Sequence, residues 1–357
     1  MVDTVVLHIG RHKTGSTSIQ ETLIRNARLL RRRRILYTNR LPTCHSAFFV
    51  DAFSDNPVAN PVHNRLGRTE AEIQAKVAND LRKLRDEINV FKPHTVIFSG
   101  EDACSRLSAE GISRMKATLT TIYRPTRFRI IFYTRHPISF AQSAIQQNVK
   151  ANGVTLNDAK DYFVKGGGLR YADVHEKYVG VFGQEAVEFL SFEKESTAPE
   201  GLVAGFFRHL QISVEGLQLH RMNESICSEV VRFMSWLLES PTLAPNEQLK
   251  LQQNRQPRVP VTEEDRRVLF SLSGSNGGLL SGRDEQTLWN AVADDVAFLK
   301  KAYQIEYLPP EPLNDNGCDG LSTGFINQCK KVLPQLSPSL RQELKKFLKL
   351  NENALNL

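Results

Sequence analysis

The first half of the chain alternates short apolar runs with longer segments of helical periodicity. Apolar runs rich in β-branched and aromatic residues predict buried strands, and they cover residues 5–9, 35–37, 95–99, 128–134 and 186–192. Amphipathic segments predict helices between them, at residues 18–30, 69–89, 108–122, 137–149, 171–181 and 202–210. This alternation predicts an α/β fold, with a central parallel sheet of about five strands flanked by helices.

The rest of the chain shows helical periodicity without further strands. We expect helices at 224–238, 284–303 and 338–350. Stretches rich in proline, glycine and amide side chains predict irregular connections at 240–262 and 306–323. The expected organisation is therefore an α/β domain over residues 1–240 and a mostly helical C-terminal extension over 241–357, packed on the same domain.

Residues 38–67 have no regular period. Pro42, Pro57 and Pro61 interrupt this segment, which also contains several Asn and His residues. A loop of this length inside a compact domain usually has a function. We expect an irregular functional loop here.

The first predicted strand leads into a loop of the kind that binds phosphate. The sequence L-H-I-G-R-H-K-T-G-S-T-S at residues 7–18 places glycine and hydroxyl residues between the strand and a helix. The free N–H groups and the dipole at a helix N-terminus favour an anion. Lys13 adds a full positive charge beside it.

This loop differs from the Walker A loop of nucleotide-binding proteins. Gly10 and Gly15 have the Walker spacing and Thr17 takes its hydroxyl position, but Ser16 stands where that motif has lysine. Lys13 precedes the second glycine instead. The alternative without a ligand is a strand followed by a helix that Ser16 or Thr17 caps.

Two further predicted strands end in polar residues. Glu101 follows the strand at 95–99, and Arg135 follows the strand at 128–134. Ligands of parallel sheets bind beyond the carboxyl ends of the strands, so we expect both residues to converge with the first loop. Arginine matches phosphate oxygens well, although an arginine paired with a surface carboxylate is the plainer reading.

The charge is concentrated in the first part of the chain. The 357 residues carry a net charge of +7, but residues 1–150 hold 24 Lys and Arg against 12 Asp and Glu. An anionic ligand would be attracted there. The densest run, Arg31 to Arg34, suits either an anionic surface or the negative end of a helix dipole. Because no aromatic residues alternate with it, we expect no nucleic-acid partner; peripheral membrane contact stays open.

Cysteine usage and hydropathy indicate the compartment. The five cysteines are odd in number and lack C-x-x-C spacing, which argues against a disulfide framework or a zinc site. There is no run of 18 apolar residues, and the N-terminus lacks the pattern of a secretory signal. We expect a cytoplasmic protein without a transmembrane segment and without a metal site.

Taken together, these motifs resemble those of the sulfotransferases that use 3′-phosphoadenosine-5′-phosphosulfate (PAPS). The K-x-G-[ST]-[ST] loop of that family stands here at residues 13–17, and its R-x-P-x-x-x-x-x-S segment stands at 135–143. An S-x-E strand end at 99–101 and a Y-A-D-V segment beginning at Tyr171 are similar to the bacterial and carbohydrate-type branches. The resemblance covers about residues 4–240 and implies a fold like that of the P-loop NTPases.

The resemblance also implies an activity. The donor would be PAPS, the product adenosine 3′,5′-bisphosphate (PAP), and no metal ion would be required. Residues expected to bind the donor are Lys13, Thr14, Gly15, Ser16, Thr17, Ser18, Arg135 and Ser143. The acceptor would be a hydroxyl group, most readily that of a carbohydrate or glycoconjugate, with a small metabolite as the alternative. A nucleotide kinase fits less well, because Ser16 replaces the phosphate-binding lysine.

Three residues are catalytic candidates on this resemblance. Lys13 would stabilise the charge that develops on the leaving group. Glu101 stands where carbohydrate sulfotransferases have glutamate, and it would be the general base; a salt bridge with the basic surface is its alternative. His45 lies in the 38–67 segment, the expected acceptor loop, and would contact the acceptor or assist the base, unless it is simply solvated.

Four further residues are weaker candidates. His12 precedes the loop lysine and would support the site indirectly. His136 stands where the family often has Asp, a departure that leaves the adjacent arginine in place. Lys165 and Arg170 flank a glycine run that is loosely similar to a phosphate-binding segment of the family, with a flexible hinge as the alternative.

Overall fold

The computed structural model describes residues 2–221, 226–240, 261–274, 278–311 and 321–355. The chain divides into two compact units, and each is built from separate stretches of sequence. The sheet unit comprises Met1–His136, Arg170–Asn223 and Asp294–Tyr307, and the helical unit comprises Pro137–Leu169, Glu224–Ala293 and Leu308–Leu357. The domain boundary expected after residue 240 falls next to a segment outside the described residues and stays a prediction.

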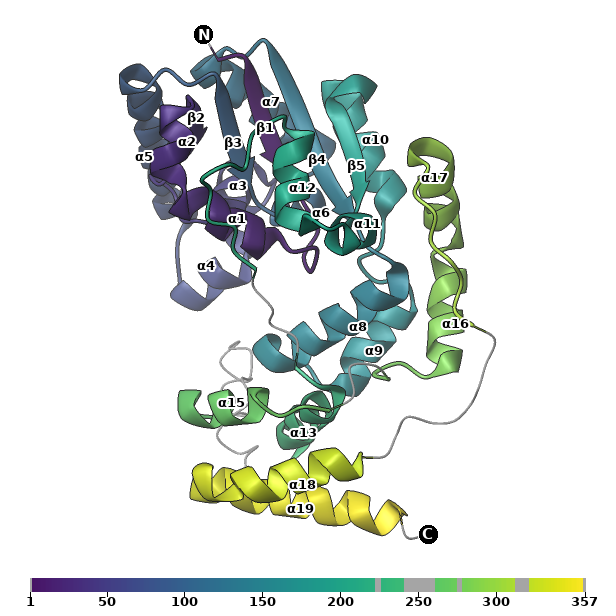
Figure 1. The fold of residues 1–357 in the computed structure, drawn as a ribbon. Coiled ribbons are helices and arrows are strands. Elements are labelled where there is room, and N and C mark those ends of the chain that lie inside the picture. The colour runs from purple at the N-terminus through teal and green to yellow at the C-terminus, as the bar shows by residue number, and fades with distance from the viewer. Residues whose placement is uncertain (1, 222–225, 241–260, 275–277, 312–320, 356–357) are drawn as a thin grey trace. The chain divides into compact units, whose positions relative to one another are not determined.

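Five parallel strands form the sheet, as the apolar runs predicted. They are β1 (Thr4–His8), β2 (Ile35–Tyr37), β3 (Thr95–Ser99), β4 (Arg127–Thr134) and β5 (Val187–Ser191). Their order is β2-β3-β1-β4-β5 (Figure 1). The central strand β1 pairs in parallel with β3 and β4, and His8 lies opposite Ser99. The carboxyl ends of these three strands therefore lie at one edge of the sheet.

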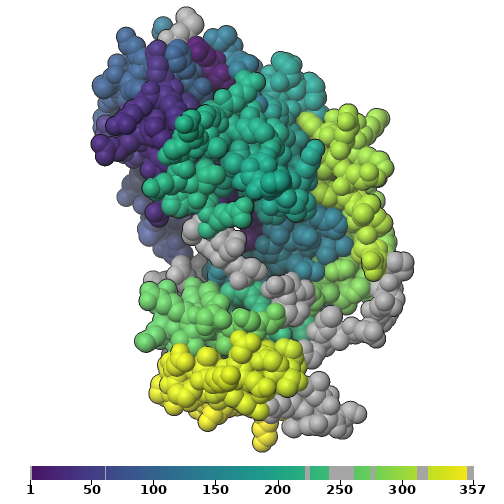
Figure 2. Space-filling model, in the orientation of Figure 1, coloured from purple at the N-terminus to yellow at the C-terminus, as the bar shows by residue number. Residues whose placement is uncertain are grey.

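Helices cover both faces of the sheet. On one face lie α1 (Ser16–Arg25), α2 (Ala27–Arg32) and α12 (Gly201–His209). Their apolar side chains form a core with the sheet, including Ile19, Leu23, Ile97, Tyr133 and Phe206. Figure 2 shows the atoms of α12 beside those of α1 on the surface of this unit.

The opposite face has an aromatic core. It is covered by α3 (Ser46–Phe53), α5 (Glu70–Val90), α7 (Ala109–Tyr123) and α10 (Tyr171–Phe182). The ring of Phe98 in β3 lies 6.0 Å from that of Phe49 and 5.9 Å from that of Tyr123. Shorter elements complete the unit: α6 (Asp102–Arg106), η3 (Gln184–Ala186), α11 (Phe192–Thr197) and α17 (Ala293–Tyr303), whose first residue belongs to the helical unit.

The irregular loop predicted at 38–67 is wrong over much of its length. The segment contains α3, η1 (Pro57–Ala59) and α4 (Pro61–Leu66). Two of its prolines stand in the first turn of a helix, where proline is favoured because no N–H is needed there. The side chains of Asn56 and Asn60 cap these helices. The prolines thus begin helices here and do not interrupt them.

Two long predicted helices are each divided in two. The helix expected at 18–30 begins at Ser16 and breaks at Asn26, whose side-chain amide donates to the carbonyls of Thr22 (2.7 Å) and Gln218 (2.9 Å). The helix expected at 284–303 breaks at Val292, between α16 (Gly282–Ala291) and α17. Neither break has a proline or glycine to signal it.

The helical unit contains no strand among its described residues. Its helices are α8 (Pro137–Gln147), η2 (Asn148–Asn152), α9 (Leu156–Val164), α13 (Ser228–Glu239), α15 (Glu263–Phe270), α16 (Gly282–Ala291), α18 (Thr323–Val332), η4 (Leu333–Gln335) and α19 (Pro338–Leu355). Phe233 of α13 packs against Phe347 of α19, with ring centroids 5.2 Å apart. The predicted helical C-terminal region is thus confirmed. The irregular stretches expected at 240–262 and 306–323 lie largely outside the described residues.

The arginine run after the first helix has structural partners. Arg31 forms an ion pair with Glu87, while Arg33 and Arg34 donate to main-chain carbonyls. These contacts favour a structural role for the arginine run over a role in binding an anionic surface. Within the described parts of the chain, no helix has the length and apolar character needed to span a bilayer.

Candidate active site

The structure brings three predicted strand-end groups together in the sheet unit. The Arg135 guanidinium donates through Nη1 to the main-chain carbonyl of Lys13. On the other side of the loop, His12 Nε2 lies 3.0 Å from the Asp102 carboxylate. The phosphate loop, defined here as Gly10–Ser18, is therefore tied to the ends of both β3 and β4.

The loop turns into α1 through a left-handed residue. Gly15 has a φ of 77° and stands at the N-cap position without any side-chain cap. The left-handed backbone favours glycine, and a Cβ atom there would lie 2.2 Å from Leu202 Cδ2, so any larger residue would force Leu202 to move. The first turn of α1 holds no acidic residue. The positive end of this helix is thus open to an anion, and the side-chain cap considered as an alternative is not observed.

Two loop hydroxyls face the protein. The Thr14 hydroxyl donates to the carbonyl of Arg11 at 2.6 Å, and the Ser16 hydroxyl does so at 3.5 Å. Both residues are buried, whereas Thr17 is exposed. The hydroxyls of Thr14 and Ser16 therefore brace the loop, which leaves its main-chain amides as the groups suited to a phosphate.

Arg135 lies on the opposite side of the loop. Its guanidinium stacks over the Phe192 ring, 4.9 Å from the centroid, and its Nε is buried without a hydrogen-bond partner among the described residues. Burial lowers the pKa of Arg135, while the Glu193 carboxylate acts in the opposite direction. The Tyr171 hydroxyl fixes the backbone by donating to the Arg135 carbonyl at 2.6 Å. An unpaired buried guanidinium nitrogen beside a phosphate loop fits an anionic group of a ligand.

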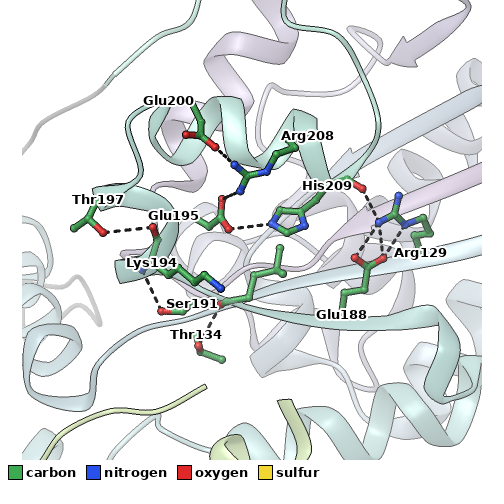
Figure 3. Close-up of polar contacts among 11 residues, drawn as sticks. Arg129, Thr134, Glu188, Ser191, Lys194, Glu195, Thr197, Glu200, Arg208 and His209 are labelled. Carbon is green, nitrogen blue, oxygen red and sulfur yellow. Dashed lines mark hydrogen bonds and ion pairs between the residues drawn. The ribbon is translucent and has the colours of Figure 1, made fainter. Parts of the chain in front are cut away.

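A polar network joins α11 to α12 and to the neighbouring strands (Figure 3). Glu195 in α11 is buried and accepts from Arg208 (2.8 Å) and His209 (3.0 Å) of α12. The His209 carbonyl in turn accepts from Arg129 of β4, which is paired with Glu188 of β5. This network fixes the two helices that supply the Phe192 and Leu202 contacts described above.

Glu101 lies at the end of β3 with its carboxylate largely buried. It is 8% exposed, and its Oε2 accepts from the Cys44 thiol at 3.3 Å and from the Ser46 hydroxyl at 3.4 Å. Burial and, to a smaller extent, the charge of Glu101 together raise the pKa of Cys44 to about 11. Cys44 is therefore a thiol at neutral pH and donates to the carboxylate. This arrangement differs from the surface salt bridge considered as an alternative for Glu101.

The neighbouring carboxylate, that of Asp102, has partners different from those of Glu101. Asp102 pairs with His12 (3.0 Å) and with Arg106 (3.3 Å). Desolvation alone would lower the pKa of His12, but its hydrogen bond to Asp102 and the charges of Glu101 and Asp102 outweigh this, so the pKa is raised. His12 thus anchors the loop to α6, and the shift of its pKa favours the charged form of its ring.

The structure places His45 in the core. The side chain is fully buried, and its Nδ1 accepts the main-chain N–H of Ser99 at 3.1 Å. Burial lowers the pKa of His45 to about 4, with the Thr38 carbonyl acting in the opposite direction. The solvated loop histidine considered as an alternative is therefore wrong, and a catalytic role for His45 stays a prediction.

Other predicted residues lie outside this set. Ser143 on α8 and Lys165 belong to the helical unit, so their predicted contact with the donor stays a prediction. Arg170 is exposed at the start of α10. His136 follows Arg135, and its main-chain N–H donates to Glu193 at 2.8 Å.

Comparisons with known proteins were made against families, curated proteins and solved structures. No family model matches the chain, and no curated protein matches it. A sulfotransferase from Alicyclobacillus acidocaldarius, known from its crystal structure, is similar with a TM-score of 0.37 and 16% identity, over 71% of this chain and 96% of that one. The sulfotransferase domain from the curacin biosynthetic pathway is similar with a TM-score of 0.34 and 10% identity, over 82% of this chain and 96% of that one.

Both TM-scores lie below 0.5, so these similarities carry no argument about activity. The function proposed below rests on the residues of the site and on the sequence motifs at 13–17, 99–101 and 135–143.

Several residues of the site escaped the sequence analysis. Arg11 is buried with its guanidinium 5.9 Å from the centre of the Tyr171 ring, and its carbonyl receives the loop hydroxyls. Cys44 and Ser46 contact Glu101 from a segment that looked irregular. Ser46 is the first residue of α3 and Cys44 lies two residues before it, at a helix start that the sequence pattern did not predict.

The site offers positive charge and hydrogen-bond donors for anionic groups. Lys13, Arg11 and Arg135 supply the positive charge, and the N-terminus of α1 supplies main-chain donors. Across the described residues, no group of three or more His, Cys, Asp or Glu side chains comes together as a metal site. What the arrangement can do chemically is hold a phosphate-bearing ligand beside a buried carboxylate.

Proposed function

We propose that this protein is a sulfotransferase that moves the sulfuryl group of PAPS to a hydroxyl group of an acceptor. The observation that carries the proposal is the hydrogen bond of Arg135, at the end of β4, to the Lys13 carbonyl. Glu101 lies at the end of β3, on the other side of β1. The hydrogen bond joins both halves of a donor-binding motif beside a candidate base. PAPS, when bound, supplies a sulfur–oxygen bond that breaks with its electron pair going to the 5′-phosphate.

The residues of the chain have separate roles in this proposal. The main-chain amides of Gly15–Ser18 hold the 5′-phosphate at the N-terminus of α1. Lys13 stabilises the negative charge that develops on the leaving phosphate oxygen. Arg135, with its free Nε, binds the 3′-phosphate. Positioning and charge stabilisation of this kind suit group transfer, which needs little covalent help from the protein.

Glu101 is the proposed general base. It takes the proton of the acceptor hydroxyl as the new oxygen–sulfur bond forms. The Cys44 and Ser46 donors on Oε2 orient the carboxylate and leave Oε1 for the acceptor. Its low exposure excludes bulk water from one side of the reacting atoms.

A carbohydrate or glycoconjugate is the proposed acceptor. The support is the glutamate at position 101, which matches the carbohydrate-type pattern given above. A hydroxyl of a small metabolite is the second choice. We place the protein in the cytoplasm on its cysteine usage.

The first test separates donor binding from nucleotide binding. Thermal unfolding is measured with PAP, with ATP and Mg²⁺, and with AMP as the matched control that lacks the 3′-phosphate. We expect PAP to raise the melting temperature well above the shifts given by ATP or AMP. Equal shifts for all three ligands, or ATP hydrolysis by the purified protein, would contradict the proposal.

The second test identifies the acceptor. The protein is incubated with ³⁵S-labelled PAPS and separate pools of sugars, glycolipids and small hydroxylated metabolites, and products are resolved by mass. Label transferred to a sugar-containing pool supports the carbohydrate acceptor. Label found only on small metabolites selects the alternative, and absence of label from every pool counts against sulfuryl transfer.

A further inference from the structure

Ser99 at the end of β3 is enclosed by side chains from three other elements. The residue is fully buried, and its hydroxyl lies 2.8 Å from His8 Nδ1 of β1 and accepts from Gln20 Nε2 of α1 at 3.1 Å. Its main-chain N–H donates to His45 Nδ1 at 3.1 Å, and its carbonyl accepts the main-chain N–H of His45 at 2.8 Å. We call these four residues the Ser99 cluster.

The cluster is tied directly to the two functional segments beside it. Ser99 is separated from Glu101 by Gly100 alone, and Gln20 is part of the helix that begins at the phosphate loop. The main-chain N–H of Gly100 also donates to the His8 carbonyl at 3.0 Å. A shift of Ser99 would therefore change the distance between Glu101 and the loop.

His45 links the cluster to the carboxylate by a second route. The residues on either side of it, Cys44 and Ser46, are the two that donate to Glu101 Oε2. The Ser46 hydroxyl also accepts the main-chain N–H of Asp102 at 3.2 Å. His45 bonds Ser99 through both its backbone and its ring, so it sets where both donors meet the carboxylate.

The fit around this segment is close. A Cβ atom on Gly100 would lie 2.7 Å from the Ser46 nitrogen and 2.9 Å from the His45 carbonyl carbon. The His45 ring also packs at 4.7 Å from the Tyr37 ring and 5.3 Å from the Phe98 ring. The segment thus has little room to move unless the Ser99 contacts change.

Both histidines are fixed in the neutral form by their surroundings. Burial lowers the pKa of His8 to about 4, against the charge of Glu101, and it lowers the pKa of His45 to about 4 as well. Neither side chain is exposed. A ring that already accepts a main-chain N–H and has no access to solvent cannot take a proton from an acceptor molecule.

We propose that His45 is a positioning residue of the reaction, which acts through the Ser99 cluster to hold Glu101 at a fixed distance from the phosphate loop. This inference rests on the proposed function. It assigns His45 a different task from contact with the acceptor, and it adds His8, Gln20 and Ser99 to the residues on which turnover depends. A displacement of a catalytic group by about 1 Å can cost about 10²-fold in rate.

The test uses two substitutions of His45 that differ in which ring nitrogen they imitate. The Oδ1 of His45→Asn takes the place of Nδ1 and keeps an acceptor for the Ser99 N–H. His45→Gln places its amide near the position of Nε2 and loses that acceptor. We expect His45→Gln to lower kcat at least tenfold with an unchanged KM for PAPS, and His45→Asn to recover most of the loss. The same order is expected for His8→Asn and His8→Gln.

Hydrogen exchange supplies a readout that does not depend on turnover. The Ser99 amide should stay protected in the native protein and in His45→Asn, and exchange at least tenfold faster in His45→Gln. Equal kcat losses in both His45 variants, with Ser99 protection intact, would overturn the proposal and return His45 to direct contact with the acceptor. Unchanged kcat in His45→Gln despite lost protection would overturn it too.

The same measurements separate this inference from the proposed function. If the native protein neither binds PAP nor transfers sulfuryl groups, the proposed function fails, and with it the role of the cluster in turnover. The exchange pattern would then still report whether His45 holds Ser99. If the native protein is active and His45→Gln, which loses the acceptor for the Ser99 N–H, matches it in kcat, the cluster proposal alone fails.

Discussion

The phosphate loop and the Ser99 cluster lie on adjacent strands, yet they use their polar groups in opposite ways. The loop turns the Thr14 and Ser16 hydroxyls inward and presents the uncapped N-terminus of α1. In the cluster, the hydroxyl, N–H and carbonyl of Ser99 all have partners within the protein. The loop therefore offers donors to a ligand, whereas the polar groups of Ser99 are paired within the protein, two residues before Glu101.

This contrast explains how one sheet edge can hold the Ser99 cluster in place and still offer hydrogen-bond donors to a ligand. A buried polar group is costly unless it is hydrogen-bonded, so Ser99, whose polar groups all have partners, resists displacement. The loop beside it is constrained through Arg11, Arg135 and Asp102 rather than by a cap on α1. Substitutions in either region test this contrast.

The largest effect is expected from Glu101→Gln. Loss of the base should lower kcat by about 10²–10⁴-fold, while PAP still raises the melting temperature as in the native protein. The control is Glu110→Gln, at an exposed carboxylate in the first turn of α7. Steady-state turnover and thermal shifts are the measurements. Native turnover in Glu101→Gln would remove the residue from the chemistry.

Lys13→Ala tests the phosphate loop. Without the positive charge, kcat should fall by about 10²–10³-fold, and PAPS should bind more weakly. The φ of 67° at Lys13 is equally unfavourable for alanine and lysine, so the backbone cost does not change. Lys92→Ala, at an exposed lysine of the same charge, serves as the control. Similar rates for the two variants would contradict the role of Lys13.

Gly15→Ala tests whether the packing against Leu202 leaves room for a side chain at residue 15. Gly67 is a matched control, since its φ of 61° is similar and a Cβ there would meet nothing within 4 Å. Gly67→Ala should cost about 1 kcal/mol of unfolding free energy. Gly15→Ala should cost about 1–3 kcal/mol more, because Leu202 must move. Denaturant unfolding measures both, and equal losses would show that Leu202 yields freely.

The two regions also differ in what the sequence could reveal. The loop is local, because residues 10–18 carry its glycines, lysine and hydroxyls in one stretch. Arg135 and Glu101 were found because parallel strands end at the same edge. The Ser99 cluster joins positions up to 91 residues apart through ring nitrogens and a buried hydroxyl, and no spacing rule predicts such contacts. The prolines of 38–67 hid η1 and α4 for a different reason, because proline marks helix starts as well as loops.

The smallest effect is expected on stability at acid pH, and it tests the Ser99 cluster. His45 is neutral in both the folded and unfolded chain above pH 6.5, its ordinary pKa. As the pH falls below 6.5 the unfolded chain binds a proton first, because burial keeps the folded pKa near 4, so stability is lost between those two values. At pH 5 the loss due to His45 should be about 2 kcal/mol. His8 should contribute a similar loss.

The measurement compares the native protein with His45→Asn, whose side chain does not titrate. Urea unfolding at pH 7.5 and pH 5 gives the acid-dependent loss for each, and groups common to both, such as His12, cancel in the difference. We expect His45→Asn to lose about 2 kcal/mol less than the native protein over this range. An identical loss in the two proteins would mean that His45 is protonated in the folded state. Its ring could not then accept the Ser99 N–H through Nδ1, and the Ser99 cluster would have to open in acid.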